Sequence, residues 1–144
     1  MGVEEINLDG GLLGLQAISV ERDTKLNPAT AAAAAKEMIT KDGVNVLIGG
    51  LSSSVGLAVS EVARQEKVIY IATIAKTIQM TTNKRHNYVF RTASHTDFEG
   101  DAMAQIAKQL NAKSICLLCS IPFFNKKTSE LADCVFNVVN VNIS

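Results

Sequence analysis

The sequence contains no tryptophan, two prolines and three cysteines, and its fourteen basic and fourteen acidic side chains cancel. Because the net charge is zero, no overall field attracts nucleic acid or an anionic membrane, and we expect no nucleic acid partner. The apolar runs are far shorter than the roughly 20 residues of a membrane-spanning helix. No basic, then apolar, then small-residue leader is visible, so no signal peptide is expected in this chain. What the sequence does have, 47% hydrophobic and 19% charged residues, indicates a globular domain.

The cysteines do not suggest a metal or redox site. Cys116 and Cys119 have CxxC spacing, but they lie in a predicted buried strand, where side chains three residues apart point to opposite faces. A zinc site would need a second pair of ligands, and a redox pair belongs at a helix N-terminus. We therefore expect core packing here, with no metal and no cofactor.

Strand and helix patterns alternate along the chain. Helices are predicted at 3–7, from Asn27 and Pro28 to about residue 42, after Ser54, at 98–110 and at 131–138; strands are predicted at 15–21, 44–48, 68–72, 88–92 and 115–119. Asn27 supplies an N-cap oxygen and Pro28 occupies the first helical position. This alternation with short links predicts an α/β fold, a doubly wound parallel sheet.

One strand-to-helix junction has the features of a binding site. The strand at 44–48 runs into residues 49–54, which include two glycines and the serines Ser52, Ser53 and Ser54. Ligands of open α/β sheets bind beyond the carboxyl ends of the strands, and a helix N-terminus there offers unpaired N–H groups and a partial positive charge. The segment therefore suits a small anion such as a carboxylate. Alternatively, Ser52 or Ser53 serves only as an N-cap.

A second loop, at 73–77, follows the strand at 68–72. If the two strands are parallel neighbours, both loops lie at the same edge of the sheet, and Lys76 would pair with a ligand anion or simply remain at the surface. Catalytic motifs are not completed: a nucleophile elbow would need glycine at Ser54, the loop has no Walker lysine, and no dinucleotide fingerprint is present. His86 and His95 lack spaced partners. We expect no enzyme.

The order of these segments resembles the type I periplasmic solute-binding proteins, which capture branched-chain amino acids and related solutes for ABC importers. Residues 3–14 resemble the end of the family's first helix, and the match continues in register through 22–31, 48–54, 75–77 and 88–92 to about residue 119. The resemblance implies a Rossmann-like lobe, with residues 1–93 as part of the first lobe and 94–144 as the beginning of the second.

The resemblance also implies site residues. In the family, the first lobe holds an amino acid's carboxylate and ammonium groups through the serine loop and the next strand-end loop, and an aromatic residue of the second lobe contacts the ligand. The matching positions are Ser52, Ser53, Ser54, Ile74, Ala75, Lys76 and Phe124.

The function implied is binding of a small carboxylate-bearing solute, an amino acid, as the substrate-binding component of an ABC importer. Its partner would be an ABC permease, and its location periplasmic or extracellular with a lipid anchor. A ligand-sensing domain of a regulator or receptor is the alternative, and a partial protein without activity is a third hypothesis.

The resemblance further implies truncation at both ends, because the family's first strand and most of its second lobe have no counterpart here. The strands at 15–21 and 44–48 would flank that first strand. An empty slot would leave unpaired backbone groups, each costing on the order of 1–3 kcal/mol. We therefore predict direct pairing of these strands or a homo-oligomer through open sheet edges. The tail with Val139, Val141 and Ile143 is a candidate to fill the slot.

Overall fold

The computed structural model describes residues 2–111, 114–116 and 140–142. Its centre is a three-stranded parallel sheet in the order β1 (Val46–Gly49), β2 (Ile69–Ala72) and β3 (Val89–Arg91). The register places Gly49 of β1 beside Ala72 of β2, and Ala72 beside Arg91 of β3. All three strands therefore end at the same edge, as the sequence pattern predicts for neighbouring parallel strands.

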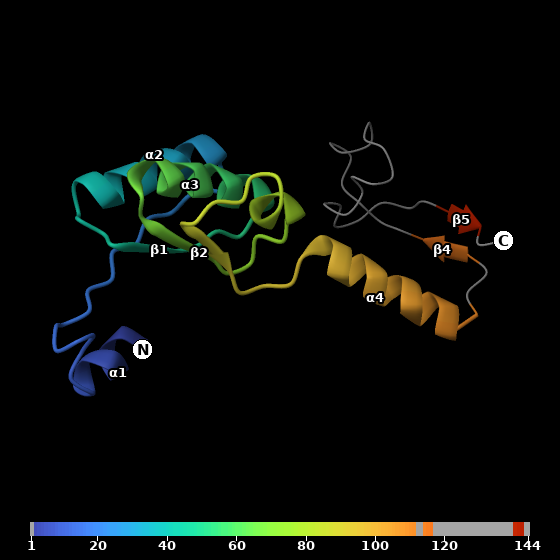
Figure 1. The fold of residues 1–144 in the computed structure, drawn as a ribbon, viewed down its shortest axis with the longest axis horizontal. Helices are drawn as coiled ribbons and strands as arrows, with labels where there is room; N and C mark the ends of the chain where they lie inside the picture. Colours follow the sequence, from blue (N-terminus) through green and yellow to red (C-terminus); the bar gives the residue numbers. More distant parts are fainter. Residues whose placement is uncertain (1, 112–113, 117–139, 143–144) are drawn as a thin grey trace.

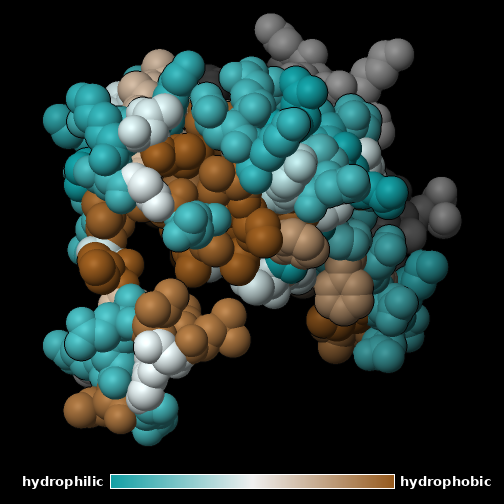
Figure 2. Space-filling view, turned by 60° about the vertical axis from the view of Figure 1, so that its left-hand side comes forward, coloured by the Kyte–Doolittle hydropathy of each residue, from teal (hydrophilic) through white to brown (hydrophobic). Residues whose placement is uncertain are grey.

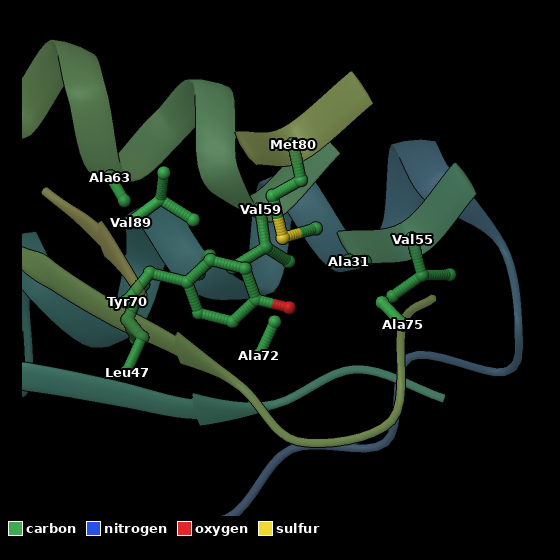
Figure 3. Packing of buried hydrophobic residues seen from close by; sticks show 11 residues of the cluster. Ala31, Leu47, Val55, Val59, Ala63, Tyr70, Ala72, Ala75, Met80 and Val89 are labelled. Atoms are coloured by element: carbon green, nitrogen blue, oxygen red, sulfur yellow. The ribbon is translucent and has the colours of Figure 1, made fainter. Parts of the chain in front are cut away.

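Two helices, α2 (Pro28–Thr40) and α3 (Ser53–Glu66), lie side by side over one face of the sheet (Figure 1). The side chain of Asn27 accepts a hydrogen bond from the Thr30 amide, as predicted for an N-cap. Side chains alternate along the strands, so one set points toward these helices and is buried. The resulting core contains Leu47, Val59, Tyr70, Met80 and Val89 with several alanines (Figure 3).

The opposite face of the sheet is uncovered. It carries Val46, Ile48, Ile69 and Phe90, four large apolar side chains that are all exposed, Ile48 to 69%. We call these four residues the open sheet face. An apolar sheet face is normally packed against another layer of secondary structure. Among the described residues, no such layer covers this face, and Figure 2 shows apolar surface exposed on the molecule.

The N-terminal part of the chain stands away from this body. Helix α1 (Gly2–Leu8) is followed by a tight turn in which Leu12 and Leu15 exchange backbone hydrogen bonds. Asn7 joins the two ends of this unit, because its side chain donates to the Ala17 carbonyl and accepts from the Ala17 amide, at 2.9 and 2.7 Å. We call residues 2–17 the N-terminal arm; Figure 1 shows α1 well below the sheet.

The chain leaves the sheet through α4 (Thr96–Gln109), none of whose side chains is buried. A 3₁₀ turn, η1 (Ile78–Thr81), lies between β2 and β3. Strands β4 (Ser114–Cys116) and β5 (Asn140–Asn142) pair antiparallel in a separate small sheet. The predicted helix at 131–138 lies outside the described residues. Among those that are described, no helix has the length and hydrophobicity to span a membrane.

The prediction of a strand at 15–21 is wrong. This segment has no regular structure beyond the Leu12–Leu15 bridge. The backbone of Ala17 is hydrogen-bonded to the side chain of Asn7 instead of to a neighbouring strand, and Arg22, just after the segment, forms an ion pair with Asp42 at 2.8 Å. Direct pairing with β1 is therefore also wrong, and a cavity of about 330 Å³ separates residues 20–24 from β1. The tail does not fill this slot either, since Asn140–Asn142 pairs with β4. Of its three apolar residues, Val139 and Ile143 lie outside the described residues.

Candidate functional site

The glycine-serine loop connects β1 to α3 through two left-handed glycines. Gly49 and Gly50 have φ angles of +129° and +89°, which side chains other than hydrogen rarely tolerate. Ser52 is the N-cap of α3: its hydroxyl accepts a hydrogen bond from the Val55 amide at 3.3 Å. Ser52 is thus an N-cap, and its hydroxyl can still donate a hydrogen bond, so the proposed role of Ser52, Ser53 and Ser54 in binding a ligand stays a prediction.

The first turn of α3 is suited to an anion. The amides of Ser53 and Ser54 open the helix, so no carbonyl one turn earlier can accept their hydrogen bonds. The aligned peptide dipoles place a partial positive charge at this end. Ser53 is half-buried and Ser54 exposed, and the Ser54 hydroxyl lies 3.2 Å from that of Ser52. Together these groups can bind a carboxylate.

The loop at 73–77 lies next to the glycine-serine loop, as the parallel arrangement predicts. The Gly49 carbonyl accepts hydrogen bonds from the Thr73 amide at 3.3 Å and from the Tyr70 hydroxyl at 3.0 Å. Tyr70 is buried in the core, and this desolvation raises its pKa to about 12. A neutral phenol donating to a backbone carbonyl thus ties the end of β1 to β2 at neutral pH.

Small residues allow the second loop to pack onto α3. Ala75 is fully buried, and a Cβ added at Gly56 would lie 2.7 Å from the Ala75 Cβ. Figure 3 shows Ala75 and Val55 close to each other at this edge of the core. Ile74, one residue earlier, is about half exposed. Of the predicted site residues, Ala75 therefore contributes backbone and packing, whereas Ile74 presents an apolar side chain.

Lys76 already has an anionic partner. Its ammonium group forms an ion pair with Glu99 of α4, and Ser94 donates to the same carboxylate oxygen at 2.6 Å. The hydrogen bond from Lys76 is the main cause that keeps the pKa of Glu99 below its usual value. A ligand anion would have to compete with Glu99 for Lys76. The sequence pattern gave no sign of Glu99, which is 23 residues away along the chain.

A further polar contact ties β3 to the same loop. Arg91 donates to the Thr77 carbonyl at 2.7 Å and to the Thr81 hydroxyl at 2.9 Å. Partial burial of the guanidinium group lowers the pKa of Arg91. Both hydrogen bonds are made to residues of the same chain, so Arg91 stabilises the segment after β2 and does not offer its charge to a ligand.

The contact between Ser60 and His86 resembles half of a catalytic triad but has the wrong polarity. The Ser60 hydroxyl lies 2.8 Å from His86 Nε2, while His86 Nδ1 accepts the Tyr88 amide at 3.2 Å. Since Nδ1 is the acceptor, neutral His86 carries its proton on Nε2 and donates it to Ser60. A general base would have to accept from the serine instead, so this pair does not activate a nucleophile.

The structure does not bring Phe124 or the three serines to the cavity beside β1 among the residues that it describes. Phe124 lies outside the described residues, so its position relative to the loops is a prediction still. The cavity beside β1 is lined by Gly49 and Gly50 but by none of the three serines. Within the described part of the chain, no group of three histidine, cysteine, aspartate or glutamate side chains could hold a metal ion.

Comparison with known proteins identifies the family. A family model described as periplasmic binding protein matches residues 1–121. The leucine-specific-binding protein of Salmonella typhimurium is 29% identical over 103 residues, which are 72% of this chain and 27% of that protein. The leucine-, isoleucine-, valine-, threonine- and alanine-binding protein of Pseudomonas aeruginosa is 29% identical over 119 residues, 82% of this chain and 31% of that protein.

A solved structure agrees. The branched-chain amino acid transporter substrate binding protein of Streptococcus pneumoniae, in complex with isoleucine, superposes with a TM-score of 0.70 at 28% identity over 77% of this chain and 32% of that one. The chain thus spans less than a third of the length of the relatives it matches. These relatives are solute-binding proteins and not enzymes, in line with the expectation from the sequence. The chain belongs to the type I periplasmic binding proteins, in the group that includes the branched-chain amino acid binding proteins.

Proposed function

We propose that this chain binds the carboxylate end of an amino acid or similar small solute, as part of the substrate-binding component of an ABC importer. The carboxylate lies at the first turn of α3, on the amides of Ser53 and Ser54 and the hydroxyl of Ser53. The loop at 73–77 forms the neighbouring wall, with Ile74 beside the ligand's apolar part. The partner is an ABC permease, and the location is periplasmic or extracellular with a lipid anchor.

The observation that carries the proposal is the meeting of two loops at one edge of the sheet. The hydrogen bond between Thr73 and Gly49 and the close packing of Ala75 on Gly56 hold the second loop against the start of α3. A helix N-terminus with small polar side chains, next to a partly apolar loop, matches the two ends of an aliphatic amino acid. The names of the two relatives above specify leucine in one case, and leucine, isoleucine, valine, threonine and alanine in the other, which supports an amino acid ligand.

We also propose that residues 1–93 belong to one ligand-binding lobe and residues 94–144 to the start of another. Helix α4 begins just after this boundary, and none of its side chains is buried. Two described contacts link it back to the first unit: the ion pair of Glu99 with Lys76, and the hydrogen bond at 3.2 Å from the Thr96 amide to the Lys76 carbonyl. Phe124 would contact the ligand from the second lobe.

Titration calorimetry of the 144-residue chain with leucine, isoleucine and valine tests the ligand assignment. A site walled on one side leaves the ligand solvated, so we expect a dissociation constant near 1 mM, about 4 kcal/mol of binding free energy. Ser53→Ala should weaken binding by roughly 1–2 kcal/mol, because a hydrogen bond to a charged group is lost. Ser19→Ala, at an exposed serine of the linker before α2, is the matched control and should leave affinity unchanged.

Two results would contradict the proposal. A folded Ser53→Ala variant with unchanged affinity would remove the main site assignment. Micromolar binding by the chain would contradict the one-sided geometry, since it requires roughly 4 kcal/mol more than millimolar binding. Circular dichroism of each variant separates a loss of affinity from a loss of fold.

A further inference from the structure

We propose, on the basis of the function proposed above, that Glu99 binds the ammonium group of the ligand and thereby selects zwitterionic amino acids over carboxylic acids without an amino group. The carboxylate of the ligand stays at the first turn of α3. Its ammonium group lies on the other side of the loop at 73–77, where α4 begins. Glu99 then determines specificity, in addition to the residues that hold the carboxylate.

Three segments follow the strand ends at one edge of the sheet. The glycine-serine loop follows β1, the loop at 73–77 follows β2, and residues 92–99 follow β3. The third segment is held against the second, because the Thr96 amide donates a hydrogen bond to the Lys76 carbonyl at 3.2 Å. Glu99, in the first turn of α4, therefore lies beside the loop that forms a wall of the proposed ligand site.

The Glu99 carboxylate has one oxygen in use and one available. Lys76 and Ser94 both donate hydrogen bonds to Oε1. Oε2 has no hydrogen-bond partner among the residues that the structure describes. An ionised carboxylate can accept about four hydrogen bonds, so Oε2 can bind an ammonium group while Lys76 stays on Oε1. The Glu99 side chain is 40% exposed, so a ligand can reach it.

The charges of this pair favour a zwitterion. The hydrogen bond from Lys76 is the main cause that lowers the pKa of Glu99, so its carboxylate is ionised at neutral pH. A ligand that carries only a carboxylate is repelled by Glu99 or has to displace it from Lys76. A ligand with an ammonium group next to its carboxylate gains an attraction at the same place.

The spacing of the strands fits the two charged groups of an amino acid. Strands β1 and β3 flank β2, so their ends lie two strand spacings apart, about 9–10 Å. The ammonium nitrogen and a carboxylate oxygen of an α-amino acid are about 3 Å apart. A hydrogen bond of about 3 Å at each end extends this span to roughly 9 Å. One amino acid can therefore bridge the segment after β1 and the segment after β3.

Nuclear magnetic resonance titration of the ¹⁵N-labelled chain tests the proposal with two ligands, leucine and 4-methylpentanoate, which is leucine without its amino group. The amide signals of Ser53 and Ser54 report the carboxylate of both ligands. The chain should prefer leucine. Glu99→Gln should reduce this preference about fivefold or more, because leucine loses an ion pair and 4-methylpentanoate loses a repulsion. A merely structural change would alter both affinities alike and leave their ratio unchanged.

Asp97→Asn is the matched control. Asp97 lies in the same first turn of α4 and is exposed, and it forms no ion pair or side-chain hydrogen bond with the described residues. The variant removes the same charge from the same end of the helix and leaves the contact between Lys76 and Glu99 in place. The preference for leucine should therefore persist.

The outcomes separate the role of Glu99 from the proposed function. Suppose that both ligands shift the amides of Ser53 and Ser54. Equal affinity for the two ligands, a leucine preference that Glu99→Gln leaves unchanged, or an equal loss in Asp97→Asn would then overturn the role of Glu99 and leave the carboxylate site standing. Binding of neither ligand, or shifts that spare both serine amides, would overturn the proposed function and the role of Glu99 together.

Discussion

Replacing Gly56 by alanine tests how tightly the two loops of the site are packed together. The added Cβ would lie 2.7 Å from the Ala75 Cβ and 2.9 Å from the Met80 Cε. Met80 can rotate its terminal methyl group away, but the Ala75 Cβ moves only with its backbone. The loop at 73–77 must therefore shift, and with it the wall of the proposed ligand site.

The expected magnitude follows from two opposing effects. Alanine stabilises a helix interior by about 1 kcal/mol relative to glycine. Forcing a methyl group into a packed interior costs about 1–3 kcal/mol. Gly100→Ala isolates the second effect, because Gly100 lies within another helix of 14 residues and its added Cβ would meet nothing within 4 Å. The free energy of unfolding of Gly56→Ala should fall below that of Gly100→Ala by about 1–3 kcal/mol.

Urea denaturation followed by far-ultraviolet circular dichroism measures this difference. The dependence on urea should keep the same slope in both variants, so that a change in midpoint reports stability. Gly56→Ala should also weaken amino acid binding, whereas Gly100→Ala should not. Equal stabilisation by the two alanines would mean that the loop moves away without resistance, and would refute the tight packing inferred here.

Two further predictions concern charge. Glu99→Gln should strengthen binding of an anionic solute because it releases Lys76, and Lys76→Ala should weaken it. Each change should be about 0.5–1 kcal/mol and smaller at high salt. Calorimetric titration at two salt concentrations checks both variants, and unchanged affinities would show that Lys76 has no part in binding. Burial lowers the pKa of His86 from its usual 6.5, so the neutral ring is favoured in the folded state. Its contribution to stability should be complete above that pH and decrease as the pH falls below it, because protonation of Nδ1 removes the acceptor of the Tyr88 amide. Urea midpoints between about pH 7 and pH 5 should show this slope, and a His86→Gln variant with the same slope would assign it to another group.

Local chemistry made much of the fold predictable. Asn27 and Pro28 define the start of α2 through capping and a fixed φ angle, which depend on neighbouring residues alone. The strand patterns at 44–48, 68–72 and 88–92 each matched an observed strand to within two residues at either end. Because neighbouring strands of the sheet are parallel, the loops that follow β1 and β2 could be predicted to lie at the same edge. These features follow from short-range preferences and one topological rule.

Features that depend on distant partners were not predictable in this way. The apolar residues at 15, 17 and 20 suggested a strand, but a strand needs a neighbour, and Ala17 instead bonds to Asn7. Lys76 looked free in sequence because Glu99 lies beyond β3. The contact of Gly56 with Ala75 left no signal at all, since small residues are common in helices and loops for many reasons.

The proposed ligand site depends on the position of β1. Val46 and Ile48 belong to the open sheet face, and the strand continues directly into the glycine-serine loop. Among the described residues, β1 pairs with one neighbour, β2, so its position depends on that ladder and on the bond from Tyr70 to Gly49.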